Sequence, residues 1–86
     1  MKARKTPRIT LYSTHSCSHC RQLRAWLKQQ GLAFREFDIQ RNARAFKEFQ
    51  RHGGRSVPLL VAGDQTIRGF DAKRLPAQLR KAGIPL

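Results

Sequence analysis

The sequence predicts an α/β fold in which a four-stranded mixed sheet is flanked by three helices. Short apolar segments alternate with segments whose apolar residues recur every three or four positions, which is the pattern of strands followed by amphipathic helices. Further along, two apolar segments are separated only by a turn around Gly63-Asp64, which adds a hairpin. A chain of 86 residues builds one modest core, and helices on both faces of a single sheet bury its apolar residues economically.

Seven elements follow from this pattern. In chain order they are a strand at 8–13, a helix at 18–30, a strand at 33–39, a helix from 42 to about 52, strands at 57–61 and 66–68, and a helix at 71–82. Residues 1–7 form a basic tail that we expect to be flexible, so the folded domain is expected at residues 8–86. The alternation in the first part favours parallel strands joined by right-handed crossovers, and the hairpin adds an antiparallel edge.

The helix ends are marked by particular residues. Gly31 is well suited to the position after the end of the first helix. Asn42 is expected to cap the second helix. The residues of that helix expected to face inward are Ala45, Phe46 and Phe49. Asp71 is expected to cap the last helix, in which Pro76 lies near the first turn and should delay or bend the helix rather than break it.

Two cysteines are separated by two residues at the expected start of the first helix. The first turn of a helix has unpaired N–H groups and the positive end of the backbone dipole, so an anion is favoured there. We therefore expect the Cys17 thiol to ionise more readily than a free cysteine. Cys20 lies one turn further on, where it can reach the same sulfur and is expected to be more buried. The pair predicts an attacking thiolate, Cys17, and a resolving thiol, Cys20, that closes the disulfide.

The cysteine count and the lack of long apolar runs limit the class of protein. Two cysteines do not make a disulfide scaffold. No run approaches the roughly 18 apolar residues of a membrane span, and no apolar h-region follows the basic start of the chain. We expect a cytoplasmic protein, because in that compartment a C-x-x-C pair is kept reduced and is more often catalytic or metal-binding than structural.

The charge is strongly unbalanced, since 18 basic residues against five acidic ones give a formal net charge of +13. Such a surface attracts anionic partners and steers their approach at rates that fall with salt. One interpretation is a solvated surface with no dedicated partner, and the other is an acidic protein client or an anionic thiol. Nucleic-acid binding is less favoured, because the sequence has no basic stripe with interleaved aromatic residues to stack bases.

Three short segments, taken together, resemble the glutaredoxin family. They are Cys17-Ser18-His19-Cys20 after the first strand, Ser56-Val57-Pro58 before the third strand, and Gly69-Phe70-Asp71 before the last helix. The resemblance covers residues 9–82, nearly the whole chain. A lone C-x-x-C pair is a weak signal, whereas the three segments at this spacing are fairly specific.

The resemblance implies a thioredoxin-like fold with the element order βαβαββα. It also implies a thiol–disulfide oxidoreductase that reduces protein disulfides or glutathione mixed disulfides through the C-x-x-C dithiol. Gly69-Phe70 is similar to the thioredoxin-active, glutaredoxin-like electron donors of ribonucleotide reductase. Glutathione is then the expected co-substrate, with no tightly bound cofactor. Either glutathione or thioredoxin reductase is the expected electron source. A disulfide-bearing protein is the expected client, acidic under the second interpretation of the charge, and a monomer is the expected state.

The resemblance further implies a cis peptide bond between Val57 and Pro58, which would place the Val57 backbone beside the nucleophilic sulfur. A glutathione or peptide substrate could then pair with Val57 as an added strand. Gly69 would allow a close backbone approach, and the N–H groups of Phe70 and Asp71 could receive the glutamyl carboxylate of glutathione. The alternatives are a trans Pro58 that starts an edge strand, a simple turn glycine and an ordinary helix-capping aspartate.

The chain departs from the family pattern at three positions. Thr14 stands where the family usually has a lysine that helps to hold thiolate and glutathione, and His15 or Arg41 could replace that charge. Ser18 stands in place of proline, and His19 in place of an aromatic residue. A histidine between the cysteines would stabilise the thiolate and make the disulfide more oxidising. Solvated side chains are the alternative for both histidines.

Other functions were weighed against the enzyme. One is an iron–sulfur carrier, in which a homodimer holds a cluster through two Cys17 thiolates and two glutathione thiols. Ser18 leaves this open, since proline at this position tends to oppose it within the family. A zinc site from Cys17, Cys20 and two histidines is disfavoured, because His15 and His19 interleave with the cysteines. The last is a binding module that docks an acidic partner, with the redox pair modulating the contact.

Overall fold

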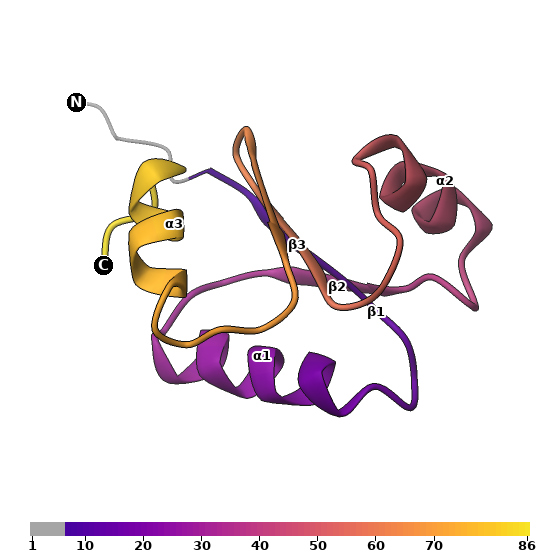
Figure 1. The fold of residues 1–86 in the computed structure, drawn as a ribbon, viewed down its shortest axis with the longest axis horizontal. Coiled ribbons are helices and arrows are strands. Elements are labelled where there is room, and N and C mark those ends of the chain that lie inside the picture. The colour runs from indigo at the N-terminus through magenta and orange to yellow at the C-terminus, as the bar shows by residue number, and fades with distance from the viewer. Residues whose placement is uncertain (1–6) are drawn as a thin grey trace.

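The computed structural model, which describes residues 7–86, has a four-stranded mixed sheet and three helices, so the predicted fold class is confirmed (Figure 1). In chain order the elements are β1 (Ile9–Ser13), α1 (Ser18–Gln29), β2 (Arg35–Asp38), α2 (Ala43–Arg51), β3 (Leu59–Ala62), β4 (Gln65–Arg68) and α3 (Leu75–Lys81). The strands lie in the order β2-β1-β3-β4. The flexible tail was predicted at residues 1–7, of which 1–6 lie outside the described part of the chain.

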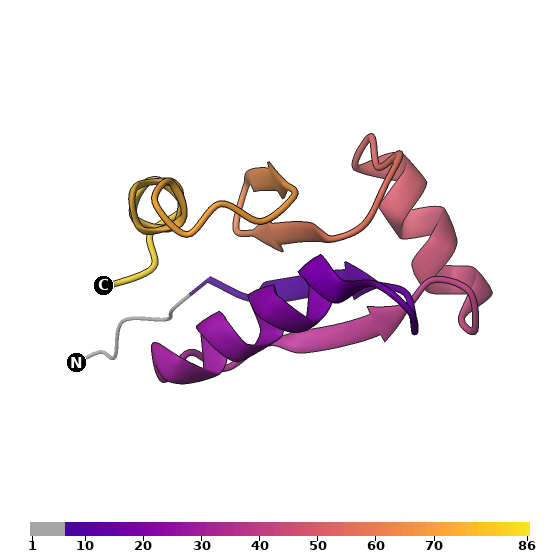
Figure 2. The same ribbon diagram turned by 60° about the horizontal axis from the view of Figure 1, so that its bottom comes forward.

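Helices cover both faces of the sheet, as predicted (Figure 2). On one face, α1 and α3 enclose the larger cluster of buried residues, which includes Leu23 of α1, Leu79 of α3 and strand residues such as Leu60. On the other face, α2 forms a smaller cluster. Its buried members are Tyr12, Ala45, Phe49 and Leu59. The smaller cluster lies toward the end of β1 that leads into the cysteines, so α2 covers that end of the sheet.

The ends of α1 and α2 follow the sequence signals. Gly31 has φ +70°, a left-handed conformation that glycine adopts without steric cost. The Asn42 side chain accepts a hydrogen bond from the Ala45 N–H at 3.0 Å, so the predicted cap of α2 is confirmed. Both helices therefore begin and end within two residues of the predicted positions.

The start of α3 differs from the prediction. Asp71 does not cap this helix; its carboxylate accepts from the Lys73 N–H at 3.0 Å and so closes a separate turn ahead of the helix. Pro76 is the cause, because it has no N–H with which to bond one turn back. The regular helix therefore begins only at Leu75, which agrees with the expected delay.

The direction of β3 was predicted wrongly. The alternation of strands and helices favoured parallel pairing, and β2 is indeed parallel to β1, but β3 runs antiparallel to β1. A parallel strand would require the chain to return to the opposite end of the sheet. Instead, α2 is short and sits at the end where β2 finishes (Figure 1), so β3 starts at that same end and runs back.

The inward position of Phe46 was also wrong, since its side chain is 41% exposed. Ala45 and Phe49 are one turn apart and both face the sheet. The next residue, Phe46, is rotated by about 100° from Ala45 and lies on the flank of α2. Its ring stacks on Phe49 with centroids 6.2 Å apart.

Candidate active site

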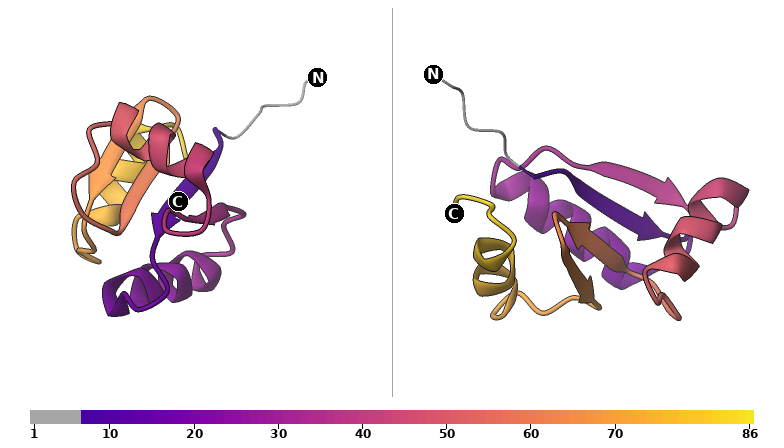
Figure 3. Two further views of the ribbon diagram at one scale, coloured as in Figure 1. Left: turned by 90° about the vertical axis from the view of Figure 1, so that its right-hand side faces the viewer. Right: turned by 90° about the horizontal axis from the view of Figure 1, so that it is seen from above.

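Four connections meet at one end of the sheet (Figure 3). The ends of β1 and β2 are adjacent, since Ser13 pairs with Asp38 in parallel register. Leu59, the first residue of β3, pairs with Tyr12 near the end of β1. Arg68, the last residue of β4, pairs with Leu59. The residues after β1, after β2, before β3 and after β4 therefore lie around one edge. The predicted site residues belong to these connections or to the first turn of α1, which follows the connection after β1.

The two cysteines form a disulfide in this structure. Cys17 is the N-cap of α1, and its sulfur accepts a hydrogen bond from the Cys20 N–H at 3.1 Å. Cys20 is fully buried, whereas Cys17 is half-buried. The first turn of α1 has no acidic residue, so no neighbouring carboxylate in that turn opposes a negative charge on Cys17. Cys20 is therefore the more buried of the two residues, as predicted.

The peptide bond between Val57 and Pro58 is cis, as the resemblance implied. Pro58 is buried, and its carbonyl accepts from the Gly69 N–H at 3.0 Å. Val57 is half-buried and packs against the smaller cluster under α2. Regular pairing of β3 begins only at Leu59 rather than at residue 57, because proline has no N–H to donate to a sheet.

The connection after β4 begins with a glycine in a left-handed conformation. Gly69 has φ +75°, and a Cβ added there would meet no atom of the described chain within 4 Å. The backbone conformation therefore requires a glycine at position 69, and the space beside it is open. Phe70 is half-buried and packs against the larger cluster, while Asp71 is exposed.

The remaining predicted site residues are exposed at the same end. Ser18 and His19 lie in the first turn of α1, and Arg41 lies in the turn after β2, where its N–H donates to the Asp38 carbonyl at 3.1 Å. His15 lines a hollow of about 450 Å³. The other residues of this hollow are Ser13, Thr14, Arg21, Arg24, Glu36 and Asp38. The binding roles of these side chains stay predictions.

A polar network behind the cysteines was missed in the sequence. Arg24 of α1 donates to both carboxylate oxygens of Glu36, at 2.7 and 2.5 Å, and the buried Ser13 hydroxyl donates to the same carboxylate at 2.8 Å. The hydrogen bond from Arg24 is the main reason that the pKa of Glu36 lies below its ordinary value. The network joins the last residue of β1 to β2 and α1. Glu36 is one of only five acidic residues, against 18 basic ones. This scarcity was the signal in the sequence that its carboxylate has a specific basic partner.

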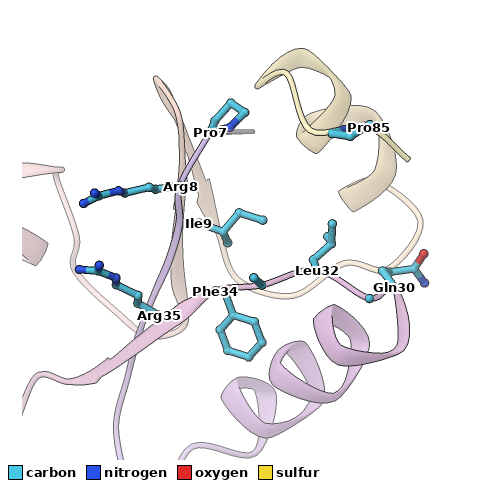
Figure 4. Close-up of a pocket in the computed structure, with 10 residues that line it drawn as sticks. Pro7, Arg8, Ile9, Gln30, Leu32, Phe34, Arg35 and Pro85 are labelled. Atoms are coloured by element: carbon cyan, nitrogen blue, oxygen red, sulfur yellow. The ribbon is translucent and has the colours of Figure 1, made fainter. Parts of the chain in front are cut away.

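A second hollow, of about 600 Å³, lies at the other end of β1 (Figure 4). Ile9, Leu32 and Phe34 are among the residues that line it, whereas the side chains of Arg8 and Arg35 extend to the opposite side of the strands. Because Ile9 starts β1 and the cysteines follow its end, this hollow is separate from the disulfide.

Within residues 7–86, no group of three or more histidine, cysteine or acidic side chains is placed to hold a metal ion. No helix in that range combines the length and the apolar composition needed to span a bilayer.

The chain matches known proteins along most of its length. The family model described as Glutaredoxin matches residues 9–67. The Glutaredoxin-like protein NrdH of Lactococcus lactis subsp. cremoris is 27% identical over 67 residues, which cover 78% of this chain and 93% of that protein. Glutaredoxin 3 of Escherichia coli is 31% identical over 64 residues, covering 73% of this chain and 77% of the relative.

A solved structure supports the same assignment. The structure of the glutaredoxin-like protein NrdH-redoxin from Escherichia coli superposes with a TM-score of 0.73 at 26% identity, covering 81% of this chain and 92% of that one. The matching family model extends over more than half of the chain and includes the C-x-x-C pair and Val57-Pro58. The chain belongs to the glutaredoxin family and is a thiol–disulfide oxidoreductase.

Proposed function

We propose that the chain reduces protein disulfides, with Cys17 as the attacking thiolate and Cys20 as the resolving thiol. The arrangement of the disulfide carries this proposal. Residue Cys17 is half-buried at the N-terminus of α1, and residue Cys20 is fully buried one turn further on. This difference supports an order in which a client sulfur meets Cys17 first and Cys20 acts second.

The reaction consists of two exchanges. The Cys17 thiolate attacks one sulfur of the client disulfide, a bond forms between Cys17 and that sulfur, and the other client sulfur leaves as a thiolate. Cys20 loses its proton to this thiolate or to water and attacks the Cys17 sulfur. The client's remaining sulfur then leaves, so the client gains two electrons and the Cys17–Cys20 dithiol becomes the disulfide. The Val57 backbone and the open space beside Gly69 would hold the client segment.

We further propose that thioredoxin reductase restores the dithiol, with glutathione as the alternative source of electrons. The E. coli NrdH-redoxin, 26% identical to this chain, is described as having a thioredoxin-like activity profile. Thr14 also stands where glutaredoxins usually have a lysine that helps to hold glutathione. Both observations favour an electron source that does not require a glutathione subsite.

The test compares insulin reduction by the wild type, Cys17→Ser and Cys20→Ser, supplied with either NADPH and thioredoxin reductase or NADPH, glutathione and glutathione reductase. We expect turnover by the wild type with thioredoxin reductase, none by Cys17→Ser, and a mixed disulfide in Cys20→Ser visible by mass spectrometry. Full turnover by Cys17→Ser would exclude the mechanism. Faster turnover with glutathione would retain the mechanism and reverse the choice of electron source.

The iron–sulfur carrier makes a different prediction for the same protein. In the carrier, the cluster is bound by the Cys17 sulfur of each of two copies and by two external thiols. The enzyme instead uses both cysteine sulfurs of one copy. Reconstitution with iron, sulfide and glutathione under anaerobic conditions separates the two. A brown dimer would favour the carrier, and a colourless monomer with insulin-reducing activity would favour the dithiol enzyme.

A further inference from the structure

The segment of residues 41–55, which comprises α2 and its two flanking turns, is strongly basic. It contains five arginine or lysine residues and a single acidic residue, Glu48. We call these five cations the basic cap. They are Arg41, Arg44, Lys47, Arg51 and Arg55, and all of them are exposed. Five of the 18 basic residues of the chain therefore lie in this segment, against one of the five acidic residues.

Little negative charge in the chain neutralises the basic cap. The two ion pairs formed among residues 7–86 join Arg24 to Glu36 and Arg74 to Asp71, and both lie outside the segment. Residues 1–6 contain no acidic residue. Glu48 accepts a hydrogen bond from the Tyr12 hydroxyl at 3.3 Å, so it points toward the sheet.

The basic cap forms a surface beside the proposed client site. Residues 44, 47 and 51 are three and four positions apart and therefore share one face of α2. α2 packs on Tyr12 and Leu59, and Val57 packs against the same cluster. The segment also ends directly before Ser56 and Val57. A client strand paired with Val57 would thus have the basic cap as its neighbour.

We infer that the basic cap selects, among the client disulfides of the proposed function, those that lie next to acidic residues. The inference rests on that function, because a reaction between two chains is accelerated when complementary charges guide the encounter. The nine residues of α2 span roughly 13 Å, the length of about four residues of extended chain. A run of about four acidic residues near the client cysteine would therefore match the length of α2. The exposed Phe46 on the flank of α2 offers an apolar contact within the same surface.

The test measures one exchange step without any reductase. Three peptides carry a single cysteine in a disulfide with uncharged 2-thiopyridine, and differ only in having four Glu, four Gln or four Lys residues within six positions of the cysteine. Release of the thiopyridone by pre-reduced protein is followed by stopped flow. At low salt we expect the Glu peptide to react on the order of 10-fold faster than the Gln peptide, and the Lys peptide to be the slowest. Salt should reduce these differences.

Two triple variants with the same loss of charge locate the effect. One replaces Arg44, Lys47 and Arg51 by Gln, and the other replaces Lys73, Arg80 and Lys81 of α3 and the turn before it, which lie away from α2 (Figure 1). We expect the preference for the Glu peptide to disappear in the α2 variant and to persist in the control. Circular dichroism and release from the Gln peptide show that both variants are folded and reactive.

The other outcomes are equally decisive. Equal rates for the Glu and Gln peptides in the wild type, or an equal loss of preference in both triple variants, would overturn the inference and leave the proposed function intact. Inhibition of the Gln-peptide reaction by duplex DNA, without a preference for the Glu peptide, would assign the basic cap to nucleic acid and also overturn it. No release from any peptide would instead refute the proposed function itself.

Discussion

Removal of the Glu36 carboxylate should destabilise the protein by about 2 kcal/mol. Glu36→Ala removes the bidentate pair with Arg24, whose two side chains are 34% and 24% exposed. A pair of this kind, partly open to water, is worth about 1 kcal/mol. The substitution also leaves the Ser13 hydroxyl, in a residue that is 3% exposed, with only the Phe37 carbonyl at 3.5 Å, which costs about 1 kcal/mol more.

The assay is thermal unfolding followed by circular dichroism. A change of about 2 kcal/mol lowers the Tm of a domain of this size by about 8–16 °C. Glu36→Gln retains one acceptor oxygen without the charge and should lose about half as much. Asp64→Asn is the matched control, because it removes an exposed carboxylate of the hairpin turn and should stay within about 0.5 kcal/mol of the wild type.

The pH dependence gives a second readout of the same network. The pKa of Glu36 is lowered in the folded state, mainly by the hydrogen bond from Arg24, so its contribution is present above the unfolded pKa of about 4.3. That contribution is lost as the pH falls through the folded pKa. The wild type should therefore approach Glu36→Gln in stability on acidification below about pH 4. A gap that is the same at pH 7 and pH 2.5, or a Glu36→Ala variant as stable as Asp64→Asn, would refute this account of the network.

Two further substitutions test the N-terminal cap of α2 and the packing of its Phe49 side chain. Asn42→Ala removes the cap that accepts from the Ala45 N–H and should cost about 1 kcal/mol in urea unfolding, whereas Asn42→Ser should restore most of it. An unchanged urea midpoint in Asn42→Ala would contradict the cap. Gly54→Ala would place a Cβ 2.5 Å from the ring of the buried Phe49, so we expect a net loss of about 1–2 kcal/mol, despite the entropic gain of replacing glycine. The loss should shrink in a Phe49→Leu background, and an equal loss in both backgrounds would show that the ring is not its cause.

Local signals in the sequence were reliable where one short segment decides the structure. Cys20, one turn into α1, is buried as predicted, and Asn42 and Gly31 mark helix ends where predicted. The conformation of Val57-Pro58 came instead from a resemblance between three separated segments. The late start of α3 follows from the chemistry of Pro76 alone.

Features that depend on how elements meet in space could not be predicted in this way. The antiparallel direction of β3 depends on where α2 lies relative to the strand ends, which the alternation of elements does not determine. The exposure of Phe46 depends on the rotation of α2 over Tyr12 and Leu59. The hydrogen bonds of Glu36 join three separate elements, and no spacing rule connects residues of β1, α1 and β2.

The pH at which Cys17 ionises in the reduced protein tests the proposed chemistry most directly. The rate of alkylation by iodoacetamide, measured against pH in Cys20→Ser, reports the thiolate at this position alone. Because the residue caps α1, its sulfur accepts from the Cys20 N–H and the first turn of α1 has no acidic residue, we expect half-ionisation clearly below the value of about 8.5 for a free cysteine. Half-ionisation at or above that value would contradict Cys17 as the activated nucleophile.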